Sequence, residues 1–217
     1  KALAVREAEL NFRECDFISS TLADSADVSC AKALECNAKP QRVFQGITPG
    51  HEGFVLTPQE RDALVKRDGK SADIIFPYLI GRELVNGDGL PKRFVIDFGR
   101  RTVLEAASFS AALERVQGTV LKARMEKAEK GKDSSGMMRS HHKQFLDHWW
   151  RLSWDRADMK SEFLKLEGRY ITGSRTQRWP FVFCFMSTGI LPGDKLQTFA
   201  FDDDYSFGIV QSSAHLG

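Results

Sequence analysis

The side chains best suited to binding another molecule lie in a basic turn that follows Gly168. Arginine can bind a guanine edge through two hydrogen bonds, and glutamine can bind an adenine edge in the same way. No Asp or Glu occurs from Gly168 to Gly193. The sequence therefore predicts a base-reading turn, with an ordinary exposed turn of solvated arginines as the alternative. The predicted DNA-binding residues of this turn are Arg169, Arg175, Thr176, Gln177 and Arg178.

Two strands are predicted to carry this turn. Aromatic and β-branched side chains crowd residues 170–173 and 179–186, and Gly173, Ser174 and Pro180 punctuate them. This composition is typical of paired strands joined by a turn. The basic turn is therefore expected at the end of a hydrophobic hairpin.

A second basic segment spans residues 115–143, where eight Lys and Arg side chains face three acidic ones, for a net charge of +5. Basic side chains that contact DNA phosphates release counterions, which supplies affinity without sequence choice. The expected phosphate contacts in this segment come from Lys122, Arg124, Arg139 and Lys143.

Two further clusters allow a functional and a structural interpretation. Asp202, Asp203 and Asp204 could hold the metal of a nuclease, or cap a helix and favour its positive end. Trp150 and Trp154 have the spacing of one helical turn, so they could stack on bases or anchor the core from one shared face. In both cases the structural interpretation is favoured.

The cysteines give no strong signal for a disulfide framework or a metal site. Cys15, Cys30, Cys36 and Cys184 form no Cys-x-x-Cys pair. Free thiols in a reducing compartment are therefore favoured over a zinc site that these cysteines would share with His141 and His142.

The remaining elements follow from apolar spacing and turn residues. A hairpin is predicted from residues 43–47 and 53–56, and Thr57 is predicted to cap a helix that begins at Pro58 and stops near Asp68. Pro77 should confine the strand at 71–80 to a sheet edge or a strand end. Other strands are expected at 93–98 and 198–201, other helices at 109–130, at 157–166 and after Asp202, and a loop at 81–91.

Length and composition bound the fold class. The 217 residues are 42% hydrophobic and 28% charged, with a net charge of +2, which favours a globular protein with one sizeable core. Residues 1–41 are acidic and close at Pro40, so they are expected to form a connector or the remnant of a preceding domain. Residues 42–217 are predicted to form one α+β domain in which short mixed strands and hairpins are packed by several helices.

The sequence contains no apolar run of about 18 residues and does not open with a signal peptide pattern. We therefore expect a cytoplasmic protein without a membrane-spanning segment.

Several phrases occur in a fixed order that resembles a known family. They are FQGITPGHEGFVL at 44–56, FPYLIGREL at 76–84, RFVIDF at 93–98, FAF at 199–201 and FGIVQSSAH at 207–215. This set is similar to the target-recognition region of large adenine-specific DNA methyltransferases, the type IIG and MmeI-like restriction-modification enzymes and their relatives in phage defence. The resemblance covers residues 43–215.

The resemblance implies a parent enzyme that uses S-adenosylmethionine to methylate an adenine within a short sequence of double-stranded DNA. The sequence contains no Asn-Pro-Pro-Tyr or Asp-Pro-Pro-Tyr motif for a flipped adenine and no glycine-rich turn for the cofactor. We therefore expect a recognition domain without catalytic residues or a cofactor of its own, which acts with a methyltransferase domain of the same parent chain.

A different class of function remains as an alternative. Exposed Trp and Phe side chains could dock a nuclease or a specificity subunit, in which case the domain would be a scaffold that touches DNA only incidentally. A continuous basic concavity around Arg175 and Arg178 would favour DNA recognition instead.

Overall fold

The computed structural model describes residues 14, 32, 39–131, 140–176 and 182–212, without the side chains of residues 140 and 141. The chain divides into the units Lys1–Pro40 and Gln41–Gly217. The connector expected at residues 1–41 lies mostly outside the described residues and stays a prediction. All elements below belong to the second unit.

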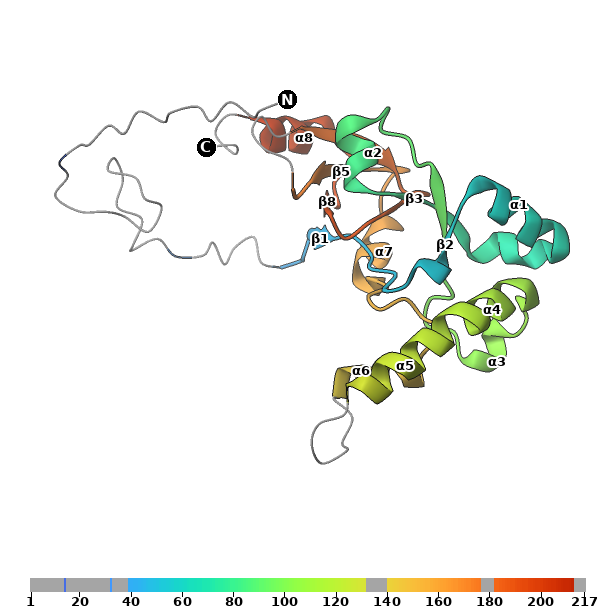
Figure 1. Ribbon diagram of the computed structural model, residues 1–217. Coiled ribbons are helices and arrows are strands. Elements are labelled where there is room, and N and C mark those ends of the chain that lie inside the picture. The colour runs from blue at the N-terminus through green and yellow to red at the C-terminus, as the bar shows by residue number, and fades with distance from the viewer. Residues whose placement is uncertain (1–13, 15–31, 33–38, 132–139, 177–181, 213–217) are drawn as a thin grey trace, which may run out of the picture. The chain divides into compact units, whose positions relative to one another are not determined.

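The first sheet is antiparallel throughout and carries the predicted hairpin (Figure 1). Its central strand β5 pairs with β6 on one side, where Tyr170 faces Met186, and with β8 on the other, where Ile171 faces Phe199. The predicted pairing of the two strands on either side of the basic turn is thus confirmed, and the described part of the second strand begins at Phe183. The strands, in sheet order, are β1 (Val43–Gln45), β8 (Leu196–Phe199), β5 (Arg169–Ser174) and β6 (Phe183–Ser187).

The second sheet mixes antiparallel and parallel pairing. Strand β3 pairs with β4 along most of its length, but with the parallel strand β7 only at Tyr78 and Leu79. Pro77 therefore lies where one side of β3 is a sheet edge, which explains how an interior strand accommodates a residue without an N–H donor. The strands, in sheet order, are β2 (Val55–Leu56), β4 (Arg93–Ile96), β3 (Ile75–Leu79) and β7 (Leu191–Pro192).

The hairpin predicted from residues 43–47 and 53–56 is wrong, because its two halves belong to different sheets. Strand β1 pairs with β8, whereas β2 pairs with β4. The chain passes from the first sheet to the second after β1, and this path requires Gly46. A Cβ at this position would meet the Gly193 carbonyl oxygen at 2.2 Å. The close approach lets the Gly46 N–H donate to the Leu196 carbonyl at 3.1 Å.

Two helices, α1 and α8, begin where their capping residues predicted. Thr57 caps α1 through its hydroxyl, which accepts from the Glu60 N–H, while the Glu60 carboxylate accepts from the Thr57 N–H at 2.8 Å. Asp203 caps α8 in the same manner, accepting from the Ser206 N–H at 2.7 Å. The described α-helices are α1 (Pro58–Arg67), α2 (Gly81–Asn86), α3 (Val103–Ala106), α4 (Ser110–Val116), α5 (Lys122–Lys130), α6 (Ser140–Asp147), α7 (Ala157–Phe163) and α8 (Asp204–Gln211).

The loop expected at residues 81–91 is wrong in its first half, where α2 forms. Glu83 stabilises this short helix, because its carboxylate accepts from the Ile80 N–H and pairs with Arg93 at 3.0 Å. The prediction of a loop used only the glycines of this segment and did not include the contact between Glu83 and Arg93, which lies on β4. The helix expected at 157–166 forms but ends at Phe163.

The helix predicted at residues 109–130 is confirmed as one continuous rod, drawn below the sheets in Figure 1. Helices α4 and α5 lie in line, joined by one wider π-helical turn at Gln117–Leu121. Helix α6 packs beside α5. The N-terminal part of the rod packs against α1 and the 3-10 turns at Glu52–Phe54 and Gly69–Ile74, and its C-terminal part packs against α6.

The core confirms the α+β class. Buried apolar side chains from both sheets and the helices form one cluster, in which the Phe163 ring stacks on Tyr170 at 4.1 Å between centroids. A buried carboxylate, Asp97, lies at its edge and is neutralised by Lys160. Among the described helices, none has the length and apolar composition to cross a membrane.

Candidate nucleic-acid interface

Of the predicted base-reading residues, Arg175 and Thr176 are exposed just beyond the end of β5. The Arg175 N–H donates to the Lys195 carbonyl at 2.8 Å, and its guanidinium reaches the Asp194 carbonyl at 3.3 Å. The Thr176 N–H donates to the Ser174 hydroxyl. Gln177 and Arg178 lie outside the described residues, so their predicted role stays a prediction.

Arg169 lies at the far end of the same strand and contacts α8. Its guanidinium donates to the Asp202 carbonyl at 2.7 Å, pairs with the Asp204 carboxylate at 2.8 Å and lies 3.8 Å from the centre of the Phe185 ring. Asp203 of the acidic triplet caps α8, as the structural interpretation predicted, and Asp202 and Asp204 also hold Arg169, a contact that was not predicted. Across the described residues no cluster of metal-ligating side chains is present.

The basic segment at 115–143 divides into exposed and buried side chains. Lys122 and Lys143 are exposed, while Arg139 lies outside the described residues. Arg115 contacts the Gly53 and Val55 carbonyls and pairs with Glu60, so part of the positive charge is used in contacts within the fold.

Arg124 is the most buried of these basic residues, with 8% of its surface exposed. Its guanidinium donates to the Phe145 carbonyl at 2.9 Å, the His148 carbonyl at 3.1 Å and the Ser153 hydroxyl at 3.3 Å. Burial lowers its pKa to about 10, so the group remains charged at neutral pH. These contacts assign Arg124 to positioning α6 and the segment after it, where the sequence alone suggested a phosphate contact.

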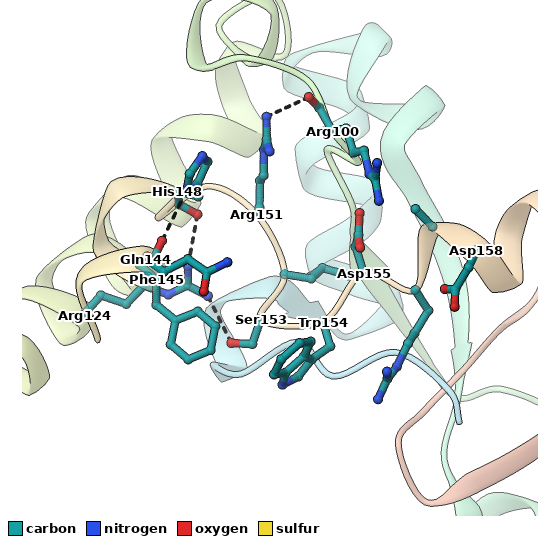
Figure 2. Close-up of a pocket in the computed structure, with 13 residues that line it drawn as sticks. Arg100, Arg124, Gln144, Phe145, His148, Arg151, Ser153, Trp154, Asp155 and Asp158 are labelled. Atoms are coloured by element: carbon teal, nitrogen blue, oxygen red, sulfur yellow. Dashed lines mark hydrogen bonds between the residues drawn. The ribbon is translucent and has the colours of Figure 1, made fainter. Parts of the chain in front are cut away.

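Around Arg124 lies a cavity of about 730 Å³, which we call the arginine pocket (Figure 2). Four arginines from three separate segments line it together with polar and aromatic side chains. Its lining is Arg100, Arg124, Gln144, Phe145, His148, Arg151, Leu152, Ser153, Trp154, Asp155, Arg156, Ala157 and Asp158.

Backbone carbonyls and an amide fix two of these arginines. Arg151 donates to the Arg100 carbonyl at 2.7 Å and the Arg101 carbonyl at 2.9 Å, and Figure 2 draws the first contact as a dashed line. Arg156 donates to the Gln45 side-chain oxygen at 3.1 Å. Within the part of the chain that the structure describes, neither these two nor Arg100 pairs with a carboxylate. Their positive charges therefore remain uncompensated by ion pairs.

The tryptophans do not share a helical face as predicted, because α6 ends at Asp147. Trp150 is buried, and its indole N–H donates to the Arg101 carbonyl at 2.9 Å, so this residue is the expected core anchor. Trp154 lies in an extended segment that bridges to Thr48 and keeps 57% of its surface exposed. The two rings therefore have separate roles.

Sequence reasoning missed Arg100, Arg151 and Arg156 as a group. Arg151 and Arg156 alternate in the sequence with Asp155 and Asp158, so no basic run marks them. The signal that was present is the density of arginines around the Trp-rich segment at residues 149–156.

Comparison of the sequence with protein-family models and with curated proteins gives no match. A solved structure gives a clear likeness in fold. The fold is similar to part of MmeI. The likeness has a TM-score of 0.64 and covers 91% of this chain and 24% of the MmeI chain, at 14% sequence identity. MmeI is a type IIL restriction-modification enzyme whose structure was determined in complex with DNA. The chain thus spans about a quarter of MmeI and shares the fold of that portion.

Proposed function

We propose that residues 42–217 form the DNA target-recognition domain of a site-specific, adenine-specific DNA methyltransferase of the restriction-modification type. The observation that carries the proposal is the arginine pocket, a group of uncompensated guanidinium groups on a fold similar to part of a DNA-bound restriction-modification enzyme. Uncompensated, pre-positioned guanidinium groups suit phosphate oxygens, since they form charge-assisted hydrogen bonds in a fixed geometry.

In this proposal two surfaces divide the work. The arginine pocket, with Lys122 and Lys143 as exposed neighbours on α5 and α6, binds phosphates and supplies affinity. The turn after β5 reads base edges through Arg175 and Thr176, together with Gln177 and Arg178. Arg169 holds α8 against the base of this ribbon.

The proposal includes a partner in the same parent chain. The S-adenosylmethionine site and the reacting adenine would belong to a methyltransferase domain, and the recognition domain would position double-stranded DNA for it. The proposal also includes a role in phage defence, in which methylation by the parent enzyme marks the DNA of its own cell. By itself, the 217-residue chain is expected neither to bind the cofactor nor to transfer a methyl group. Calorimetry with S-adenosylmethionine tests this, and stoichiometric heat of binding would contradict it.

One surface favours the alternative of a scaffold. An apolar cavity of about 410 Å³ is lined by Phe76, Phe163, Leu164 and other residues, and the Leu164 side chain there is largely exposed. Such a surface suits a protein contact. A scaffold and a DNA reader differ in one property, which is the salt dependence of duplex binding.

The 217-residue chain is expected to bind duplex DNA with a steep salt dependence. If the arginine pocket and its neighbours contact three to four phosphates, raising salt from about 50 to 200 mM should weaken binding roughly 40- to 150-fold. Fluorescence anisotropy with a labelled duplex measures this. Absence of binding at low salt, or affinity that does not change with salt, would remove the phosphate role and favour the scaffold.

Replacing Arg175 with Ala is expected to relax sequence preference at one position of the bound site. A lost bidentate contact with guanine costs about 1 to 3 kcal/mol at that base pair and leaves the others unchanged. Sequencing the duplexes that the chain retains from a randomised library, for wild type and Arg175→Ala, measures the change. Lys66→Ala, which removes an exposed positive charge on α1, is the matched control. A uniform loss over all sequences would make Arg175 a phosphate contact, and an unchanged profile would make the turn a solvated surface.

A further inference from the structure

The arginine pocket contains groups that a phosphate backbone alone does not require. Asp155 and Asp158 line it, and in the described part of the chain neither carboxylate has a hydrogen bond or an ion pair. Carboxylates repel phosphate, so a purely phosphate-binding cavity would exclude them. They can accept the exocyclic amino group of a base, as Asp and Glu do from cytosine. The Gln144 side-chain amide supplies a donor and an acceptor at the same cavity.

Trp154 presents an exposed aromatic surface whose position is fixed. Its backbone N–H donates to the Thr48 carbonyl at 3.1 Å, and its carbonyl accepts from the Thr48 N–H at 3.0 Å. Its ring meets Phe145 edge to face at 6.5 Å, and the Arg156 guanidinium lies 5.7 Å from the ring centre. A ring held this way while more than half exposed is suited to stacking on a flat partner, because little conformational entropy is lost on binding.

Backbone geometry adds a further constraint at the same place. Arg156 is the one described residue other than glycine with a left-handed backbone, at φ 51°. This conformation costs a non-glycine residue free energy, and such residues cluster at binding sites. It turns the chain directly after Trp154 and Asp155 into α7, which places the aromatic ring, the carboxylates and the arginines around one cavity (Figure 2).

The size of the cavity also fits a small ligand. About 730 Å³ lies within the range of 300 to 1,000 Å³ that small-molecule sites occupy. The chemistry combines a stacking ring, acceptors for amino groups and uncompensated guanidinium groups. A nucleotide has a complementary flat face, an edge with hydrogen-bonding groups and an anionic phosphate.

We propose that the arginine pocket receives one unpaired nucleotide displaced from the DNA. The base stacks on Trp154, its amino group donates to Asp155 or Asp158, and the adjoining phosphate contacts Arg100 and Arg151. This proposal rests on the proposed function, because the nucleotide belongs to DNA that the domain holds. It assigns the pocket to an extruded nucleotide, in addition to the paired DNA that the turn after β5 reads.

The test compares a labelled duplex with the same duplex carrying one unpaired nucleotide at its centre, bound by the 217-residue chain. The bulged duplex is expected to bind about 5- to 160-fold more tightly than the paired duplex, which corresponds to the roughly 1 to 3 kcal/mol that stacking of one base on an aromatic side chain contributes. Bulged adenine, cytosine or guanine should bind more tightly than bulged thymine, which has no amino group. Equal binding of bulged and paired duplexes would overturn the proposal.

Variants connect the preference to the pocket. Trp154→Ala is expected to bring the ratio of bulged to paired affinity to about 1, while Trp154→Phe retains most of it. Tyr205→Ala, which removes an exposed aromatic ring on α8, should leave the ratio unchanged. A ratio that survives Trp154→Ala would overturn the assignment to this pocket. Salt-dependent binding of the paired duplex reports on the proposed function separately, so loss of the bulge preference alone contradicts only the present inference.

Discussion

Replacing Arg124 with Ala is expected to lower the free energy of unfolding by about 3 kcal/mol. The substitution leaves the Phe145 and His148 carbonyls without their charged donor, and hydrogen bonds to charged groups contribute about 1.5 to 3 kcal/mol. It also removes a buried side chain that lies between the rings of Phe54 and Phe145, at 5.7 and 5.6 Å from their centres. For a chain of this length the melting temperature should fall by about 6 to 12 °C.

Thermal and chemical denaturation of the purified variant measure this loss. Lys122→Ala is the matched control, because Lys122 is exposed two residues earlier on the same helix and should change stability by less than about 0.5 kcal/mol. Arg124→Lys should fall between wild type and Arg124→Ala, since one ammonium cannot reach all three acceptors. If Arg124→Ala were as stable as wild type, the buried guanidinium would not hold α6 in place.

Removing two of the uncompensated arginines is expected to abolish most duplex affinity. Arg100→Gln combined with Arg156→Asn removes two positive charges from the arginine pocket, and asparagine tolerates the left-handed backbone at position 156. Loss of two phosphate contacts should weaken binding roughly 100-fold at about 50 mM salt and reduce the slope of log affinity against log salt by about 2.

The control for this double variant is Lys66→Gln, which removes an exposed charge on α1 away from the pocket. Its affinity should remain close to that of wild type. Anisotropy titrations at several salt concentrations give both the affinity and the slope for each protein. Equal losses in the double variant and in the control would mean that charge acts over the whole surface and not at the pocket.

Local signals predicted much of the fold. The Thr57 and Asp203 caps, the long helix at 109–130 and the pairing of the strands beside the basic turn depend on residues near one another in sequence. The predicted hairpin at 43–56 failed because its strands find partners more than a hundred and about forty residues away, in β8 and β4. No turn residue encodes such distant pairing.

The candidate site was only partly predictable for the same reason. Arg175 and Thr176 are exposed as expected, and these two residues are consecutive in the sequence. The arginine pocket instead depends on contacts between distant segments. Arg151 donates to the backbone carbonyl of Arg100, and Arg156 donates to the side-chain amide oxygen of Gln45. Arg124 shows the limit of counting charges, because composition cannot distinguish a buried arginine from an exposed one.

Under the proposed function, the way in which the turn after β5 is attached bears on how sequence preference could change. Arg175 is attached to the neighbouring segment through the carbonyls of Asp194 and Lys195, and every amino acid carries a carbonyl. The Arg175 N–H contact is likewise available to any residue except proline. The backbone contact with Lys195 therefore depends on no particular side chain at position 175, whereas the contact with the Asp194 carbonyl depends on the Arg175 guanidinium. Under the proposed function, a substitution at position 175 would change the side chain offered to DNA and keep the backbone contact with Lys195, so the recognised sequence could diverge while the fold persists.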